Sequence, residues 1–211
     1  MKRFTLIFIL LPLFAISQGQ SFKLVTYNSL RYSTSNVDAR HPYFRTVING
    51  VEPDILVLQE ISGQASVTQF LDSVMNFDSL TYSMAPFTDG NDLDCALYYK
   101  TNKFTMVGTA NYPTVLRDIF HYKLRPKNLS DTLHVFGVHL KASTGTVNQN
   151  RRKAEVDTLR KITDALPTGS NFIVCGDFNI YSANEPAYTT LLQVNSGKNG
   201  EFNDAINITG T

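Results

Sequence analysis

Two short, uninterrupted apolar runs, at residues 55–58 and 172–175, constrain the fold of this chain more than any other feature of its sequence. Their sequences are Ile-Leu-Val-Leu and Phe-Ile-Val-Cys. Alternate side chains of a strand point to opposite sides of its sheet, so a run of consecutive apolar residues this short is typical of a β-strand covered on both faces. The sequence therefore predicts two buried strands with further layers of structure around them.

Helices and strands are predicted on either side of these runs. The clearest helix is predicted over residues 148–166, where apolar side chains recur at helical spacing and are followed by Pro167 and Gly169. Further helices are predicted over 43–50, 65–75 and 185–194, and further strands over 22–27, 95–100, 104–107, 115–124 and 133–140. Several strands follow one another in the middle of the chain, which predicts an α/β (α+β) fold with sheet packed on sheet and helices outside. We find no internal repeat or linker, so residues 21–211 are expected to form one domain.

The first 20 residues have the layout of a secretory signal peptide. Lys2 and Arg3 precede an apolar run over 4–16, and Ala15 and Ser17 occupy the −3 and −1 positions of the expected cleavage site. The run is too short for a comfortable membrane span, although an uncleaved anchor is the alternative. We expect a secreted or periplasmic protein with no stable membrane insertion.

The charge balance limits the kind of partner that the chain can hold. Lys and Arg number 19 against 18 Asp and Glu, so the chain lacks the basic excess that tight binding of nucleic acid usually requires. Contact with a polyanion is therefore expected to be local or transient. Cys95 and Cys175 both lie in apolar strand-like runs, and we expect buried thiols in preference to the disulfide that export would permit.

Polar residues cluster where the predicted strands end, which is where loops hold ligands over a rigid base. Taken singly, each has an ordinary structural alternative. Asn28 can make a turn, Glu60 can cap the next element, and His139 can be a satisfied core residue. Asp177 and Asn179 follow Gly176 and can project to one side of the chain, but they also suit an ordinary turn.

Taken together, these motifs are more specific. The stretches 25–28 (Val-Thr-Tyr-Asn), 54–60 (Asp-Ile-Leu-Val-Leu-Gln-Glu), 138–141 (Val-His-Leu-Lys) and 176–179 (Gly-Asp-Phe-Asn) occur in the order and at the spacing typical of one family. The helix carrying Asn148, Arg151 and Glu155 lies between the third and fourth stretches, as it does in that family. From residue 22 to its end, the chain resembles the endonuclease/exonuclease/phosphatase (deoxyribonuclease I-like) superfamily.

This resemblance implies a four-layer αββα sandwich of two mixed sheets. It also implies that Glu60, with Asn28 beside it, holds a divalent metal ion such as Mg²⁺, or Mn²⁺ or Ca²⁺. Asp177 would orient or deprotonate the attacking water, and Asn179 would hold Asp177 and touch the scissile phosphate. A bound divalent cation neutralises charge on the transition state and helps to activate water, which agrees with these roles.

The resemblance implies further roles at the phosphate. His139 would donate a hydrogen bond to a phosphate oxygen, and Arg117 would contact the phosphate, unless it is only a solvated charge at a strand edge. Asp94, or alternatively Asp92, would orient His139. The sequence contains neither a Gly-x-Ser-x-Gly elbow nor a His-Glu-x-x-His motif, so it gives no support to those hydrolase mechanisms.

The family has two later elements that we do not find, a late-loop Asp and a Ser-Asp-His motif on its final strand. All four His residues of this chain lie at or before position 139. We therefore expect a C-terminally truncated sequence that lacks the last strands and that is poorly stable and nearly inactive when expressed alone.

The expected function is an exported, divalent-metal-dependent phosphodiester hydrolase, nuclease-like and monomeric, whose substrate is nucleic acid. A phospholipid or inositol-phosphate phosphoesterase is the alternative within the same class, since one fold serves many substrates. A catalytically inactive binding module without the late His is the alternative from another class.

Overall fold

The computed structural model describes residues 21–35, 38–79, 81–195 and 202–204. The signal-peptide prediction concerns residues outside these ranges. The elements, in chain order, are β1 (Leu24–Tyr32), η1 (Asp38–Arg40), α1 (His41–Val51), β2 (Ile55–Ile61), α2 (Gly63–Phe70), η2 (Leu71–Met75), β3 (Tyr82–Met84), β4 (Asp94–Lys100), β5 (Phe104–Tyr112), β6 (Ile119–Pro126), β7 (Leu133–His139), α3 (Thr146–Asp164), β8 (Asn171–Asp177) and α4 (Pro186–Leu192).

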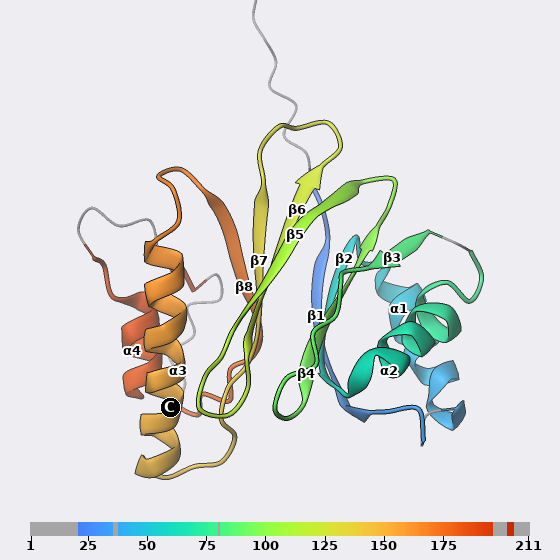
Figure 1. Ribbon diagram of the computed structural model, residues 1–211. Coiled ribbons are helices and arrows are strands. Elements are labelled where there is room, and N and C mark those ends of the chain that lie inside the picture. Colours follow the sequence, from blue (N-terminus) through green and yellow to red (C-terminus); the bar gives the residue numbers. More distant parts are fainter. Residues whose placement is uncertain (1–20, 36–37, 80, 196–201, 205–211) are drawn as a thin grey trace, which may run out of the picture.

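Two mixed four-stranded sheets face each other between two layers of helices (Figure 1). The first sheet has the strand order β1-β2-β4-β3 and the second β5-β6-β7-β8. Helices α1 and α2 cover the outer face of the first sheet, and α3 and α4 cover that of the second. The predicted αββα sandwich is therefore confirmed. No helix within the described ranges is long and apolar enough to cross a membrane.

Each sheet contains one parallel pair, β1 with β2 and β7 with β8. A parallel pair needs a crossover connection, and α1 and α3 supply the two crossovers. The carboxyl ends of the paired strands therefore lie at one edge of each sheet. Asn28 and Gln59 are register partners there in the first sheet, and His139 and Asp177 are partners in the second.

The prediction of burial on both faces is confirmed for residues 55–58, which are all buried, and only in part for residues 172–175. Cys175 is buried, but residues 172–174 are half-buried, because β8 is the last strand of its sheet among the described residues. Each run contributes to two layers of the core. In β2, Leu56 and Leu58 pack under α1 and α2, whereas Ile55 and Val57 face the second sheet. In β8, Ile173 packs between the sheets, and Phe172 and Val174 pack toward α3 and α4. Because successive side chains of a strand point to opposite faces, each continuous run contributes side chains to two hydrophobic clusters, one on each side of its sheet.

The sheets approach each other closely at Gly137 in β7. A Cβ atom on Gly137 would lie 3.1 Å from Cγ1 of Val57 and 3.3 Å from Cβ of Cys95, so a side chain there would push the sheets apart. Cys95 and Cys175 lie in this intersheet core as free, buried thiols, in agreement with the prediction.

The structure differs from the predicted elements in several places. Strands β1 and β5 end at Tyr32 and Tyr112, five residues beyond the predicted limits. Residues 115–118, predicted as the start of a strand, form a bend before β6. The bend arises because the Thr114 hydroxyl donates to the Arg117 carbonyl and accepts from the Leu116 N–H. The helix predicted to Met75 becomes a π-turn after Phe70, with the Asn76 N–H donating to the Leu71 carbonyl. The short strand β3 has no clear pattern in the sequence.

Candidate active site

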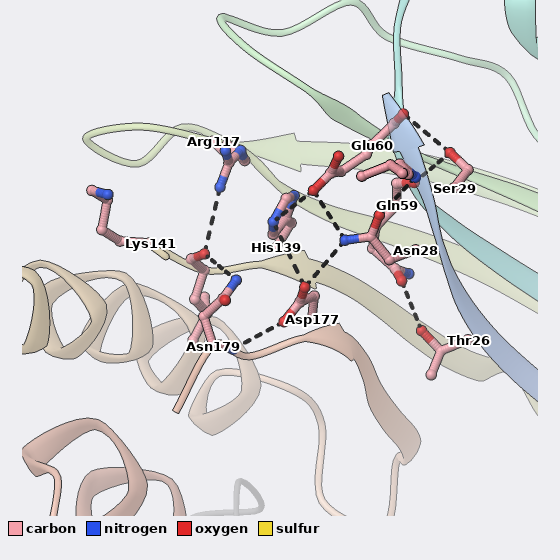
Figure 2. A network of polar contacts seen from close by, with 12 residues as sticks. Thr26, Asn28, Ser29, Gln59, Glu60, Arg117, His139, Lys141, Asp177 and Asn179 are labelled. Atoms are coloured by element: carbon pink, nitrogen blue, oxygen red, sulfur yellow. Dashed lines mark hydrogen bonds and ion pairs between the residues drawn. The ribbon is translucent and has the colours of Figure 1, made fainter. Parts of the chain in front are cut away.

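The polar residues at the ends of β1, β2, β7 and β8 meet at one point between the two sheets (Figure 2). Asn28 comes from β1, Glu60 from β2, His139 from β7 and Asp177 from β8. The structure thus brings together the sequence-predicted residues of four separate stretches. They meet because both parallel pairs end at the same edge of the sandwich.

Asn28 joins the two carboxylates of the site. Its Nδ2 donates to Oε1 of Glu60 at 3.0 Å and to Oδ2 of Asp177 at 3.2 Å. Its Oδ1 accepts the Leu30 N–H at 2.9 Å, which fixes the orientation of the amide. Asn28 therefore presents a donor to the centre and not the oxygen that a metal ligand needs. Its place in this structure is to hold Glu60 and Asp177 together across the two sheets.

Glu60 leaves the regular pleat of β2. Its φ is 61°, and the strand register shifts between Gln59 and Ile61. A non-glycine residue in the left-handed region is strained, and such strain persists only where the surroundings enforce it. The Arg31 N–H donates to Oε2 of Glu60 at 3.0 Å, and the Ser29 hydroxyl donates toward the Gln59 and Glu60 carbonyls. These bonds hold the carboxylate at the strand end.

Asp177 and Asn179 are fixed by an equally irregular backbone. The Asn179 N–H donates to Oδ1 of Asp177 at 3.1 Å, and Nδ2 of Asn179 donates to the Leu140 carbonyl at 3.1 Å. Asn179 has a φ of 49°. Gly176 has a φ of 141°, and a Cβ atom there would lie 1.9 Å from the Val138 carbonyl oxygen. The glycine of the Gly-Asp-Phe-Asn motif is therefore required by close contact with β7.

His139 faces both carboxylates from a buried position, with 4% of its surface exposed. Its Nε2 lies 3.7 Å from Oε1 of Glu60 and 3.9 Å from Oδ2 of Asp177. Burial, aided by the positive charge of Arg117, lowers the pKa of His139 although both carboxylates act to raise it. The imidazole is consequently neutral at pH 7, and neutral imidazole can donate one hydrogen bond and accept another.

Arg117 lies on the opposite side of His139 from the carboxylates, on the bend before β6 (Figure 2). Its Nη2 is 2.9 Å from Oδ2 of Asp92, and its Nη1 is 3.5 Å from the Leu140 carbonyl oxygen. The guanidinium is therefore held by an ion pair beside the site and is not a solvated charge at a strand edge.

Asp94 does not make the contact that the resemblance implies. Its Oδ1 accepts the Gly90 N–H at 3.1 Å, while Oδ2 of Asp94 and Nδ1 of His139 are both buried without a hydrogen-bond partner. Burial raises the pKa of Asp94 to about 7, and the carboxylates of Asp89 and Asp118 add to this rise. Asp92, the alternative orienting residue, pairs with Arg117 instead. No hydrogen bond from an acidic residue orients Nδ1 of His139 among the described residues.

A buried ion pair missed by the sequence reasoning supports one wall of the site. Arg152 of α3 donates from Nε to Oε2 of Glu185 at 2.9 Å and from Nη2 to Oε1 at 3.1 Å. Its Nη1 donates to the carbonyls of Lys141 and Ser143 at 2.7 and 2.8 Å. Arg152 therefore ties down residues 140–143, whose Leu140 carbonyl receives the bonds from Asn179 and Arg117.

The sequence contained a signal for this pair. Arg152 lies one helical turn before Val156 and shares its buried face, so it is a charged residue at an apolar position of the helix.

The residues of α3 noted from the resemblance are not part of this ion pair. Arg151 is exposed, Asn148 caps the Thr144 carbonyl, and Glu155 accepts the Lys141 N–H at 2.8 Å.

Two mixed sheets between two layers of helices form an αββα sandwich, a fold that also occurs in solved structures of a mannosyl-6-phosphatase and a 2',3'-cyclic phosphatase. The chain belongs to the Endonuclease/Exonuclease/phosphatase family, whose model matches residues 25–196.

One curated protein and several solved structures are similar to this chain. The protein YbhP of Escherichia coli (strain K12), itself uncharacterized, is 25% identical over 192 residues, covering 81% of this chain and 72% of YbhP. Humanized D. rerio TDP2 has a TM-score of 0.62 at 15% identity, covering 77% of this chain and 64% of that structure. The mannosyl-6-phosphatase Bt3783 of Bacteroides thetaiotaomicron has a TM-score of 0.63 at 18% identity, covering 81% and 69%.

At these identities the solved structures establish the fold alone. The chain spans somewhat less than two thirds of the TDP2 structure that it matches.

Proposed function

We propose that this protein is a divalent-metal-dependent phosphodiester hydrolase of the nuclease-like kind, exported by its N-terminal segment and active as a monomer. One observation carries the proposal. The carboxylates of Glu60 and Asp177 converge on a single donor, Nδ2 of Asn28, and face the neutral His139 with Arg117 beyond it. Anionic and cationic groups thus flank one point, as hydrolysis of a phosphate ester requires.

The residues present fit a Mg²⁺-type ion. Glu60 and Asp177 offer hard carboxylate oxygens close together, and Mg²⁺ is usually held by one or two carboxylates plus substrate phosphate and water. Within the described ranges, no group of three or more His, Cys, Asp and Glu side chains that could hold a metal ion occurs. When bound, such an ion supplies charge neutralisation at the phosphate and a more acidic water.

The side chains of this chain perform the remaining steps. Asp177 receives the proton of the attacking water as the water oxygen bonds to phosphorus and the P–O bond to the leaving oxygen breaks, and the leaving oxygen takes its proton from solvent. The bonds from Asn28 and Asn179 hold the Asp177 carboxylate in one orientation. His139 donates a hydrogen bond from Nε2 to a phosphate oxygen. Arg117 contributes a charge-assisted donor to a second phosphate oxygen. No side chain forms a covalent bond to phosphorus in this scheme.

Nucleic acid is the proposed substrate in preference to a phospholipid or a sugar phosphate. Solved neighbours include D. rerio TDP2 with a single-stranded DNA product and a mannosyl-6-phosphatase, so the fold is compatible with several phosphate esters. Nucleic acid agrees with an extracellular scavenging role, which follows from the proposed export.

The test is a substrate panel with and without EDTA, comparing plasmid nicking with phosphocholine release. For the protein at the full length encoded in its natural source, we expect nicking that requires Mg²⁺ and is abolished in Asp177→Asn. The exposed Asp157→Asn, on the outer part of α3, is the control and should keep wild-type activity. Chelator-resistant nicking would refute the metal requirement, and phosphocholine release without nicking would refute the nucleic-acid substrate. If no phosphate ester is cleaved, the binding-module alternative replaces the enzyme.

A further inference from the structure

Tyr181 presents an unusually exposed aromatic ring beside the candidate site. It lies two residues beyond Asn179, which is at most about 7 Å of extended chain, and 53% of its surface is exposed. Its hydroxyl contacts Ser143, three residues beyond Leu140, whose carbonyl holds Asn179. Figure 2 shows Lys141, in the same loop, on the side of the site away from Glu60. The Tyr181 hydroxyl is therefore bonded to the same loop, residues 140–143, that holds Asn179, the residue proposed to touch the phosphate.

Tyr181 is held at three points: its hydroxyl, its backbone N–H and one face of its ring. The Ser143 N–H donates to the Tyr181 hydroxyl oxygen at 3.1 Å, and the Tyr181 N–H donates to Oε1 of Glu185 at 3.0 Å. The guanidinium carbon of Arg152 lies 5.2 Å from the centre of the ring and covers one face. A surface tyrosine normally moves among rotamers, so this one has already lost the freedom that a ligand would otherwise have to remove.

Backbone strain is part of this arrangement. Ser143 is not a glycine, yet its φ is 80°, and its carbonyl is fixed by Nη1 of Arg152. This conformation aims the Ser143 N–H at the Tyr181 hydroxyl. Strain of this kind costs free energy and is characteristic of binding and catalytic sites. The strained conformation of the loop thus fixes the Tyr181 ring, although about half of the surface of Tyr181 stays exposed.

The contacts of the ring indicate what it binds. Its covered face lies against a buried cation, which withdraws electron density from the ring and weakens its attraction for further cations and for sugar C–H groups. The opposite face of the ring is flat and has this cation behind it, which suits stacking with another aromatic system. A nucleoside phosphate places its planar base within one nucleotide of its phosphate, which matches the position of Tyr181 beside the site.

We propose that Tyr181 forms a nucleobase-stacking subsite next to the phosphate, with Arg152 and Ser143 positioning its ring and Glu185 holding its backbone. This deepens the proposed function and rests on it for the location of the phosphate. Stacking is tolerant of base identity, so the subsite selects nucleotides over sugar phosphates and phospholipid headgroups without reading sequence.

The test is binding, which does not depend on turnover. Isothermal titration with AMP and with ribose 5-phosphate, both in Mg²⁺, measures the contribution of the base for the wild type, Tyr181→Leu, Tyr181→Phe and Tyr43→Leu. Tyr43 is the matched control, because it is 76% exposed and lies on α1 over the other sheet. Thermal unfolding of each variant establishes that it is folded.

We expect Tyr181→Leu to weaken AMP about tenfold and to leave ribose 5-phosphate within about twofold of wild type, on the scale of single base–aromatic contacts. Tyr181→Phe keeps the ring and should retain most of the AMP affinity, whereas Tyr43→Leu should change neither ligand. An equal loss for both ligands, or a loss for neither, overturns the subsite. Plasmid nicking without base-dependent binding defeats this inference alone, and base-dependent binding without nicking defeats the proposed hydrolysis alone.

Discussion

Arg152 and Glu185 form a bidentate ion pair whose side chains are 0% and 1% exposed. Arg152 in α3 also holds the carbonyls of Lys141 and Ser143, and Glu185, just before α4, also accepts the Tyr181 N–H. The pair therefore links the loop 140–143 to the segment that follows Asn179. A buried charge that loses its partner is not solvated, so the pair is more costly to break than to replace.

Arg152→Met is therefore expected to lower the free energy of unfolding by about 3–5 kcal/mol. Adding Glu185→Leu should recover part of the loss, because the unpaired carboxylate is removed, but the Lys141 and Ser143 carbonyls stay without their donor. Urea unfolding of the two single variants and the double variant measures this coupling. The exposed neighbour Arg151→Met is the control and should stay within about 0.5 kcal/mol of wild type. A similarly small effect of Arg152→Met would contradict the role assigned to the pair.

Asn28→Asp replaces the shared donor by a third carboxylate without changing the shape of the side chain. We expect the hydrolysis rate to fall about 10- to 100-fold, as is usual when a residue that orients metal-binding carboxylates is lost. Steady-state kinetics on the substrate identified by the panel give the measurement. Asn150→Asp, exposed on α3, is the matched control. Wild-type rates in Asn28→Asp would show that Glu60 and Asp177 do not depend on this amide.

Gly176→Ala is expected to destabilise the fold by on the order of 3 kcal/mol or more, because strain at positive φ adds to a steric clash. The new Cβ would meet the Val138 carbonyl oxygen at 1.9 Å. Gly108→Ala in β5 is the control, since nothing lies within 4 Å of its Cβ position, and it should change stability by less than about 1 kcal/mol. Chemical denaturation compares the two, and equal effects would refute the close contact.

Asp94 should make stability depend on pH. Its folded pKa of about 7 lies above its ordinary value of 3.8, so between these values the folded protein binds more protons than the unfolded chain. The contribution of Asp94 to the free energy of unfolding is therefore highest at low pH, where Asp94 is protonated, and falls as the pH rises from about 4 to about 7. Asp94→Asn keeps the acceptor for the Gly90 N–H and removes the charge.

We therefore expect Asp94→Asn to stabilise the protein more at pH 8 than at pH 4.5. Thermal melts of wild type and variant across this range measure the difference. The same difference at both pH values would mean that Asp94 is ionised normally in the folded state.

Much of the fold follows from local patterns. The runs at 55–58 and 172–175 predicted strands covered on both faces, and the spacing in α3 predicted a helix with a single apolar face. Both patterns depend only on the repeat of a strand or helix, which neighbouring residues define. The limits of α2 and β6 were less predictable, because a π-turn and a side-chain-bonded bend decided them.

The site shows the same division. The motifs identified Asn28, Glu60, His139, Asp177 and Asn179 as a group, and the structure brings them together. The motifs did not reveal that Nδ2 of Asn28 bonds Asp177 across 149 residues of chain. The motifs also did not predict the ion pair between Asp92 and Arg117. They did not predict that Asp94 makes no hydrogen bond with Nδ1 of His139.

Local sequence patterns established most of the strands and helices, which of their faces are apolar, and which polar residues stand at strand ends, since these are properties of neighbours along the chain. Which donor meets which acceptor depends on tertiary packing. The bonds of Asn28, the ion pair of Arg152 and the support of Tyr181 all join segments from different layers or loops. Their geometry depends on how the two sheets and α3 pack, and that packing is the sum of many distant contacts that no local pattern encodes.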